Sequence, residues 1–441
     1  MAWADSRDRL RVEELREVWP ILPPDERAEG FQLLAPEDAE DFFLSLSSFS
    51  QASVLEELPP GQRRLWMRSL APDDAADVLH ELEPEERPGY LALLDEAVRR
   101  EVTALMAYAE DDAGGLMNPR FARVRPDMTV DEAIRYLRRQ AHDQLETIYY
   151  AYILDSEQRL LGVVSFRGLF SASGDKRVEE VMETDLVSVL EDMDQEAVAR
   201  VMARHDLFAV PVVDAENHMK GIVTVDDIVD VVQEEATEDI QKLGGMEALD
   251  MPYFQTGLFT MLKKRGGWLA ALFVGEMFTA TAMGRYEHEV AKAVVLALFV
   301  PLIISSGGNS GSQASTLVIR AMALNEVRLR DWWRIAGREL GAGVLLGLLL
   351  AAIGFARILL WQVAFHSYGE HYMKVALTVS LSLIGVVTWG TLSGSLLPFV
   401  LRRLGFDPAS ASAPFVATMV DVAGLVIYFS VAQVVLSGTL L

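Results

Sequence analysis

Cysteine is absent from the 441 residues of this sequence. Disulfides and thiolate metal sites are therefore excluded, and any bound metal would take oxygen or imidazole ligands. The first residues, MAWADSRDRLRVEELREV, lack the apolar stretch of a secretory signal peptide, so we expect the part of the chain that follows to stay in the cytoplasm. Neither a P-loop nor a catalytic triad is recognisable, and we do not expect an enzyme.

Positive charge is scarce and unevenly placed. The chain has 39 Lys and Arg against 64 Asp and Glu, a net charge of −25. Residues 1–250 hold 55 acids and 25 bases, whereas residues 251–441 hold 9 acids and 14 bases. The acidic front part would repel nucleic acid and attract cations, so no nucleic-acid partner is expected. Simple solubility is the plainer explanation of so acidic a surface.

The rear part contains five runs long and apolar enough to span a bilayer, which takes about 20 residues. They cover residues 268–284, 291–321, 335–361, 374–400 and 411–438. Lysine and arginine are concentrated before the first run and in the second and fourth connections. The positive-inside rule then places the N-terminus in the cytoplasm and the C-terminus outside.

Two of these runs carry polar residues that a membrane anchor does not need. Asp421 is the one acid in APFVATMVDVAGLVIYFSVAQVVL, and an ionised carboxylate at bilayer depth is costly and rarely idle. In the second run, SSGGNSGSQAS places Gly307, Gly308 and Gly311 beside Asn309, which favours a segment that faces a pore. Helix packing through small residues is the alternative explanation for the glycines.

The first hundred residues contain a helical repeat. LPPDERAEGFQLLAPEDAED begins at Leu22 and LPPGQRRLWMRSLAPDDAAD begins at Leu58, 36 residues later, with a shorter echo at Leu82. Each unit opens with proline and acids, which are typical of helix N-termini, and continues with Leu and Ala at helical spacing. We predict a small α-helical solenoid over residues 1–116.

A second duplication follows. MNPRFARVRPDMTVDEAIRYL is echoed 65 residues later by METDLVSVLEDMDQEAVARVM, and each copy continues with two strand-like runs. This α/β alternation resembles a pair of cystathionine-β-synthase (CBS) domains, which we expect at residues 117–178 and 179–232. GIVTVDD in the second copy is similar to the adenosine-nucleotide signature of such domains, with Asp227 where the ribose would bind. Because the first copy has Gly168 there, at most one ATP-type site is expected, and a CBS pair that uses no nucleotide is the alternative.

A run rich in acids, VDDIVDVVQEEATEDIQKLGGM, leads into the rear part. It predicts a connecting helix, which we place at residues 233–262, ahead of a transmembrane domain of five helices at residues 263–441. One helical stripe of the run carries Asp227, Asp230, Glu234 and Glu238. The default interpretation of this stripe is an acidic helix face in contact with solvent. The more specific interpretation is a binding site for a divalent cation.

A multidomain chain with an acidic helical solenoid, a CBS pair, an acidic connecting helix and five spans, in this order, resembles the MgtE family of magnesium channels. The resemblance covers essentially the whole chain and includes EDDAGGLM, ETIYY, SGGNSGSQAST and RRLGFDPASASAPFVATMVDVAGLVIY. It implies a homodimer in the lipid bilayer of the inner (plasma) membrane. Such a dimer would conduct Mg²⁺ and be closed by Mg²⁺ bound to its cytosolic domains.

The resemblance also implies roles for individual positions. Asp421 matches the acid that holds hydrated Mg²⁺ in the pore, and Asp407 matches an acid at the cytoplasmic mouth. The other positions expected to line the pore are Asn309, Ala413 and Ala417. The positions that match metal ligands on the N-terminal domain are Asp41, Asp73 and Asp77. Those on the CBS pair and connecting helix are Asp194, Glu196, Asp206, Asp227, Asp230, Glu235, Glu238 and Asp239, with backbone carbonyls at Gly115 and Ala203.

The sequence departs from the family pattern in places. Ala413 stands where we expect Asn, and Asp41 stands where we expect a longer Glu. Two other functions stay open. One is a secondary transporter in which Asp421 cycles a proton, and the other is a membrane-anchored Mg²⁺ sensor whose spans only anchor it. The polar second run argues against simple anchoring.

Overall fold

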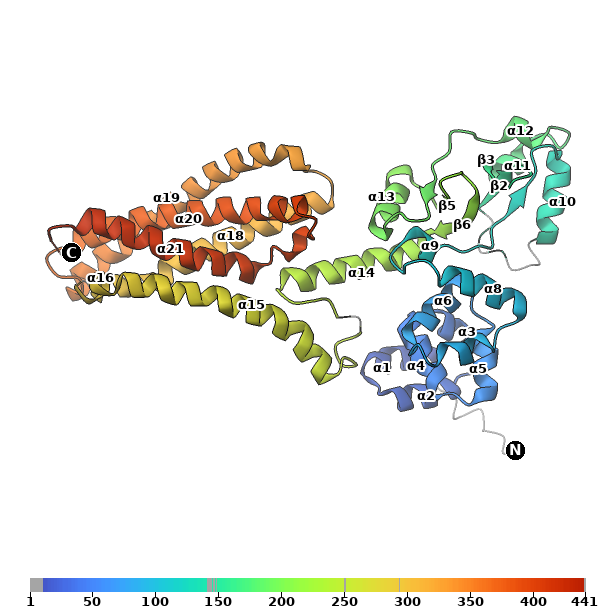
Figure 1. The fold of residues 1–441 in the computed structure, drawn as a ribbon, viewed down its shortest axis with the longest axis horizontal. Coiled ribbons are helices and arrows are strands. Elements are labelled where there is room, and N and C mark those ends of the chain that lie inside the picture. Colours follow the sequence, from blue (N-terminus) through green and yellow to red (C-terminus); the bar gives the residue numbers. More distant parts are fainter. Residues whose placement is uncertain are drawn as a thin grey trace. The chain divides into compact units, whose positions relative to one another are not determined.

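The computed structural model describes residues 11–140, 145, 147, 149–249, 251–292 and 294–439. The chain divides into two compact units, Met1–Glu235 and Ala236–Leu441 (Figure 1). The first unit holds the helical domain and the CBS pair, and the second holds the long apolar helices. This arrangement confirms the predicted multidomain fold class.

Short helices form the N-terminal domain, as the repeat predicts. They are α1 (Val12–Val18), η1 (Trp19–Ile21), α2 (Pro24–Gln32), α3 (Pro36–Leu44), α4 (Ser48–Glu57), α5 (Pro60–Met67), α6 (Pro72–Glu81), α7 (Arg87–Leu91), α8 (Glu96–Leu105) and α9 (Ala113–Leu116). The repeat sets their boundaries: α2, α3, α5 and α6 all begin at a proline, which fits the first helical turn because it lacks an N–H. Helices α5 and α6 are therefore the second copies of α2 and α3.

The CBS pair contains two sheets of identical topology. The strands are β1 (Arg123–Val124), β2 (Tyr150–Leu154), β3 (Leu160–Ser165), β4 (Val189–Leu190), β5 (Ala209–Val213) and β6 (Met219–Thr224). In each sheet the first strand pairs parallel with the second, and the second pairs antiparallel with the third. The accompanying helices are α10 (Val130–Gln140), α11 (Phe166–Ser171), α12 (Val178–Val181) and α13 (Gln195–His205).

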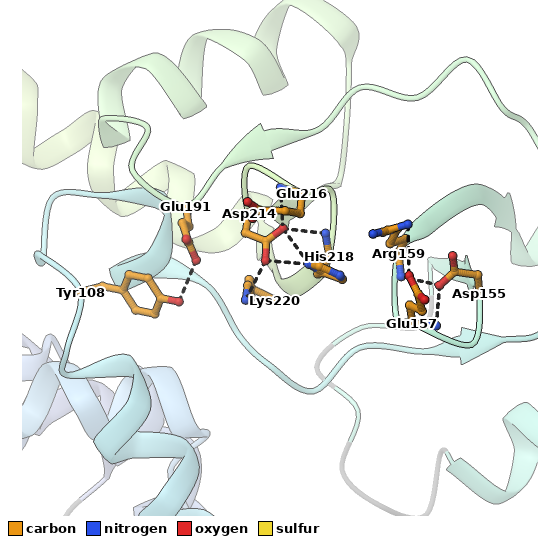
Figure 2. Close-up of polar contacts among 9 residues, drawn as sticks. All are labelled: Tyr108, Asp155, Glu157, Arg159, Glu191, Asp214, Glu216, His218 and Lys220. Atoms are coloured by element: carbon orange, nitrogen blue, oxygen red, sulfur yellow. Dashed lines mark hydrogen bonds and ion pairs between the residues drawn. The ribbon is translucent and has the colours of Figure 1, made fainter.

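The duplication extends to the hairpin turns, which Figure 2 shows together. Asp155 Oδ1 accepts the backbone N–H groups of Glu157 and Arg159 at 2.8 and 2.9 Å. The β5–β6 turn repeats this pattern, with Asp214 Oδ1 accepting N–H groups two and four residues ahead at 3.0 and 2.8 Å. An aspartate that binds backbone ahead of it fixes a tight turn. The two turns also pair with each other, since the N–H of Leu160 donates to the Asn217 carbonyl at 3.1 Å.

Helix α14 (Val225–Leu243) begins within the second CBS copy and contains the boundary between the two units. The next helix, α15, is Leu258–Arg285. The predicted connecting helix over 233–262 therefore differs from the structure, which has the second half of α14 and the start of α15 there, with no helix at the described residues 244–249 and 251–257 between them. The reason is local: paired Gly244 and Gly245 end α14, and Gly245 has a φ of 75° that favours glycine.

The second unit continues with helices up to the C-terminus. They are α16 (Glu287–Lys292), α17 (Val294–Ala297), α18 (Val300–Ala323), η2 (Leu329–Asp331), α19 (Trp332–Phe365), α20 (Tyr372–Arg403), η3 (Pro408–Ser410) and α21 (Ala413–Leu436). Among the described residues, four segments are long and apolar enough to cross a membrane: Val294–Ala323, Leu329–Phe365, Tyr372–Arg403 and Ala413–Leu436. They match four of the five predicted spans. The other, 268–284, is helical within α15, and its membrane crossing stays a prediction.

The glycine-rich motif forms an unbroken part of α18, and its glycines pack against α20. A Cβ atom on Gly390 would overlap the carbonyl oxygen of Gly307, and one on Gly394 would overlap that of Gly311. The two backbones are therefore in direct contact, as small residues allow between membrane helices. The Ser310 and Thr391 hydroxyls hydrogen-bond across the same contact at 2.6 Å. Helix packing thus explains these glycines.

This contact predicts that Gly390→Ala destabilises the second unit. The added methyl group would overlap backbone atoms, which cannot change rotamer as a side chain can. We therefore expect the free energy of unfolding to fall by about 1–3 kcal/mol. Thermal unfolding of the full chain in detergent would measure it. Gly341→Ala, in α19, is the control, because its Cβ meets nothing within 4 Å and alanine favours the helix. Equal stability of both variants would contradict the close α18–α20 contact.

Candidate metal centres

The predicted pore residues of α21 share one helix face. Ala413, Ala417 and Asp421 are four residues apart, which places them along one side of the helix. Asp421 is half-buried, and its carboxyl group lies close to that of Glu276 of α15. Glu276 also lines an open groove of about 590 Å³ with Thr418 of α21. The acid in the apolar helix thus meets a second carboxyl group.

Helix α18 packs along the same part of α21. Ser312 Oγ donates to the Ala413 carbonyl at 3.2 Å, and Ser315 Oγ donates to the Ala411 carbonyl at 2.8 Å. A Cβ on Gly308 would lie 3.5 Å from the Ala417 methyl group. Asn309, next in α18, is exposed. The structure therefore brings the α18 motif to the α21 positions that were predicted to line a pore.

Asp407 lies in the connection between α20 and α21. Its Oδ1 accepts the Ala409 N–H at 2.8 Å and caps η3, and its Oδ2 accepts a hydrogen bond from Lys242 Nζ at 2.6 Å. The same ammonium contacts Glu238, one turn earlier in α14. Burial lowers the pKa of Lys242, but the hydrogen bonds with Asp407 and Glu238 outweigh it and raise the pKa above its ordinary value. Two predicted metal-binding acids thus share one lysine.

A second acidic cluster, which we call the α6–α14 cluster, lies within the first unit. It comprises Asp73, Asp74 and Asp77 of α6 and Asp226, Asp227 and Asp230 at the start of α14. Desolvation raises the pKa of Asp77, and repulsion from Asp74, Asp227, Glu110 and Glu81 raises it further. The helical repeat and the second CBS copy therefore bring like charges together.

The neighbours of Asp77 in this cluster show the same crowding. Burial raises the pKa of Asp74, a backbone hydrogen bond with Ala71 opposes the rise, and Asp226 and Asp230 add repulsion. Burial and then Asp226 raise the pKa of Asp230. Asp74 and Asp77 both keep exposed edges, so water screens part of the repulsion.

Two residues of the α6–α14 cluster have defined hydrogen bonds. Asp73 is buried, with 6% of its surface exposed, and Asn118 Nδ2 donates to it at 2.9 Å. Asp227 accepts from the Thr224 N–H at 3.2 Å and from its Oγ1 at 2.7 Å. In the first CBS copy, Ser165 Oγ accepts the N–H of Gly168 at 3.0 Å, so no carboxylate stands at that place.

The remaining predicted positions are spread over the first unit and α14. Asp194 caps α13, and Ala203 and Asp206 lie at the other end of that helix. Glu196 pairs with Arg200 at 2.6 Å, and Glu235 accepts from Gln195 Nε2 at 2.8 Å. Gly115 lies in α9, where a Cβ would overlap the Ala109 carbonyl, and Asp239 lies in α14. Asp41 is exposed on α3 and is not among the carboxylates that act on Asp77 or Asp74.

Sequence reasoning gave no role to four residues that the structure places at these sites. They are Asp74, Asp226, Glu276 and Lys242. Asp74 and Asp226 directly adjoin assigned acids, so the acidic runs themselves could have indicated them. The contacts of Glu276 and Lys242 join residues more than 140 positions apart, for which the sequence contains no local signal.

The donor atoms of the α6–α14 cluster fit a hard divalent cation. Every acid in it offers carboxylate oxygens, which Mg²⁺ prefers, and Asn118 supplies a neutral partner. Because Mg²⁺ keeps several of its waters, the exposed edges of Asp74 and Asp77 suit it better than a closed cage would. The cluster would hold such an ion through its carboxylates, and the ion would supply the charge that offsets their repulsion.

Three family models match this chain in succession. They are the MgtE intracellular N domain at residues 10–111, the CBS domain at residues 113–175 and 178–234, and MgtE, a divalent cation transporter, at residues 300–431. The order of these domains is the one predicted from the sequence.

Individual proteins match over nearly the full chain. The magnesium transporter MgtE of Thermus thermophilus is 42% identical over 435 residues, which are 98% of this chain and 94% of that protein. The magnesium transporter MgtE of Bacillus subtilis is 30% identical over 96% of this chain and 92% of that protein. Among solved structures, the cytosolic domain of the Mg²⁺ channel MgtE in complex with ATP is 43% identical, with a TM-score of 0.47, and covers 50% of this chain and 90% of that one. The chain belongs to the MgtE family of divalent cation transporters.

Proposed function

We propose that this protein is a Mg²⁺-selective channel of the plasma membrane that cytosolic Mg²⁺ closes. The observation that carries the proposal is Asp421, a carboxyl group on an apolar helix that meets a second acid, Glu276. Relatives named magnesium transporters support the choice of ion. The proposed protein is a multi-pass homodimer in the lipid bilayer, with its N-terminus in the cytoplasm and its C-terminus outside.

The proposed pore lies along α18 and α21 of two subunits. Mg²⁺ binds oxygen ligands in near-octahedral geometry and dehydrates reluctantly, so a few carboxylates can hold the hydrated ion. One Asp421 from each subunit would face the ion, with Ala413, Ala417 and Asn309 along its path. The divalent ion would offset the repulsion between the two carboxylates, which makes an acid at membrane depth tolerable.

Closure by Mg²⁺ would follow from the acidic clusters. At low Mg²⁺, the carboxylates of the α6–α14 cluster repel one another and favour looser arrangements of the first unit. At high Mg²⁺, the ion bridges them and favours the compact state, because a ligand shifts an equilibrium toward the state that binds it better. Helix α14 would connect this change to Asp407 at the mouth of the pore. Metal-bridging roles are proposed for the other cytosolic positions too: Asp41, Gly115, Asp194, Glu196, Ala203, Asp206, Glu235, Glu238 and Asp239.

Asp227 also supports an adenosine-nucleotide site in the second CBS copy. Its carboxylate is held by Thr224 at the end of β6, and an acid at this place can accept hydrogen bonds from ribose hydroxyls. The first copy has Gly168 instead and could not do the same. A site of this kind would make ATP a second regulatory ligand of the same helix that the cation binds.

Proton-coupled transport is the second candidate, and the contact between Asp421 and Glu276 is what favours it. Two carboxyl groups that lie close together repel when both are ionised, so one of them could hold a proton, and an ion that displaces this proton would couple the two fluxes. In both candidates Asp421 meets the ion, so the driving force is what separates them.

The channel proposal predicts that Asp421→Asn removes most Mg²⁺ flux, because the neutral amide keeps the size of the side chain and loses its charge. Mg²⁺ entry into liposomes that contain the purified full chain would measure the loss, which we expect to be at least about tenfold. Glu339→Gln, in α19, is the control for an acid outside the proposed pore and should keep normal flux. Normal flux in Asp421→Asn would remove the basis of the pore assignment.

A channel should also conduct without a proton gradient. In liposomes with equal pH on both sides and an added protonophore, we expect Mg²⁺ flux to follow the Mg²⁺ gradient unchanged. Flux that stops under these conditions, or that moves protons against Mg²⁺, would favour the coupled transporter instead.

Crowding in the α6–α14 cluster predicts that Asp77→Asn weakens the response to Mg²⁺. The change removes repulsion at low Mg²⁺ and a ligand at high Mg²⁺, so the difference between the two states shrinks. Limited proteolysis of the first unit in the full chain, at low and at millimolar Mg²⁺, would show this as a smaller gain in protection.

The repeat provides the control for this experiment. Asp38 in α3 is the counterpart of Asp74 in α6, but it is not among the acids that act on Asp74 or Asp77, so Asp38→Asn should keep the wild-type response. Added KCl of equal ionic strength should not replace Mg²⁺, because a monovalent ion screens charges but does not bridge them. An unchanged Mg²⁺ response in Asp77→Asn would separate the cluster from regulation.

A further inference from the structure

Lys242 is a fixed positive charge between two acids that are proposed to bind Mg²⁺. Its Nζ lies 2.6 Å from Asp407 Oδ2 and also contacts Glu238 Oε1. These side chains are all part of the second unit. Each is only partly exposed, with 26% of the lysine, 37% of the aspartate and 34% of the glutamate side chain accessible. The lysine and an incoming cation would therefore compete for the same carboxylate oxygens.

Asp407 has one oxygen available for this competition. Oδ1 accepts the Ala409 N–H at 2.8 Å and caps η3, which leads into α21. Oδ2 holds Lys242. A metal ion on Oδ1 would compete with the N–H of the cap, so Oδ2 is the oxygen that an ion can bind while the cap stays unperturbed. An ammonium and a divalent cation that both lie against Oδ2 repel each other strongly.

The surroundings keep Lys242 close to its two acids. It lies in the last turn of α14, where a positive side chain also interacts favourably with the helix dipole. The next residue, Leu243, packs against Ala409, Ala411 and Ile319. The apolar contact holds the end of α14 at the α20–α21 connection, while the long lysine side chain itself can rotate away.

We propose that Lys242 is a tethered competitor of Mg²⁺, which sets the Mg²⁺ concentration at which Asp407 and Glu238 bind the ion. At low Mg²⁺, the single positive charge of Lys242 partly neutralises two carboxylates. At high Mg²⁺, the divalent ion neutralises both, and Lys242 turns toward solvent. The inference rests on the proposed closure by Mg²⁺ and adds to it the residue that determines the threshold.

The opposite role is a simple latch, in which Lys242 itself holds α14 against Asp407. The two roles predict opposite shifts in the Mg²⁺ concentration that closes the channel when Lys242 is removed. Loss of a competitor lets Mg²⁺ bind at a lower concentration, whereas loss of a latch weakens the closed arrangement and raises the Mg²⁺ concentration needed. The direction of the shift therefore distinguishes them.

Lys242→Gln in the full chain tests the proposal through two measurements. The first is the Mg²⁺ concentration that half-closes the channel, measured as flux from liposomes at varied Mg²⁺ on the cytosolic face. The second is the Mg²⁺ concentration that half-protects the exposed Tyr253 and Phe254 from chymotrypsin, which reports binding without any flux. We expect both to fall about tenfold, as loss of one charge-assisted contact to the acids would allow.

Three further variants make the result specific. Lys242→Arg keeps the charge and should stay within about twofold of the wild type. Lys220→Gln removes a lysine that pairs with Asp214 at 3.0 Å in the CBS pair, and should leave both concentrations unchanged. In an Asp407→Asn background, the additional effect of Lys242→Gln should be clearly smaller, because only the contact with Glu238 is then left to lose.

The outcomes separate this inference from the proposed function. A wild-type channel that Mg²⁺ does not close would overturn the proposed function. A wild type that closes, together with Lys242→Gln that shows no shift or a shift to higher Mg²⁺, would overturn the competitor role and leave the channel proposal intact.

Discussion

Repulsion between carboxylates is the constraint on which the rest of this structure depends. Two such charges 4 Å apart repel by about 1 kcal/mol in water and by about 4 kcal/mol at an effective dielectric constant of about 20. A whole domain is stable by only about 5–15 kcal/mol, so a few close pairs consume much of that margin. The α6–α14 cluster places several acids within reach of Asp77. Bound positive charge, whether protons or a cation, would relieve this repulsion.

In the membrane helices the close contacts are between uncharged groups. There the backbones of α18 and α20 approach each other closely. Gly307 and Gly311 of α18 lie against Gly390 and Gly394 of α20 so closely that no Cβ fits between them. Such contacts leave little freedom for α18 to move by itself. The connection around Asp407, which α14 contacts through Leu243 and Lys242, is instead held by polar contacts and a small apolar cluster. Movement that opens or closes a pore is therefore easier to accommodate at Asp407 than at the glycine contact.

The sequence predicts those parts of the fold that repeats and hydrophobic periodicity determine, such as the starts of the repeated helices. Proline fits the first turn of a helix and not its interior, so a repeated proline marks a helix start. Four helices of the structure begin at such a proline, at Pro24, Pro36, Pro60 and Pro72. The predicted connecting helix over 233–262 does not account for the end of α14 at Leu243, which Gly244 and Gly245 follow directly. The pairing of Lys242 with Asp407 could not be predicted, since it depends on packing between segments 165 positions apart.

The duplications also show where function has diverged from fold. Helices α3 and α6 have the same start and the same place in the repeat, yet only Asp77, and not its counterpart Asp41, lies in the α6–α14 cluster, where four acids act on it. The two CBS copies share strand order, register and turn chemistry, yet Gly168 in one corresponds to Asp227 in the other. In both cases the aspartate of the second copy takes part in the α6–α14 cluster, because the two second copies are the ones that meet there. Because the paired copies differ little in backbone, the fold alone does not require these acids. The proposed binding of cations would explain why they stand together in spite of their repulsion.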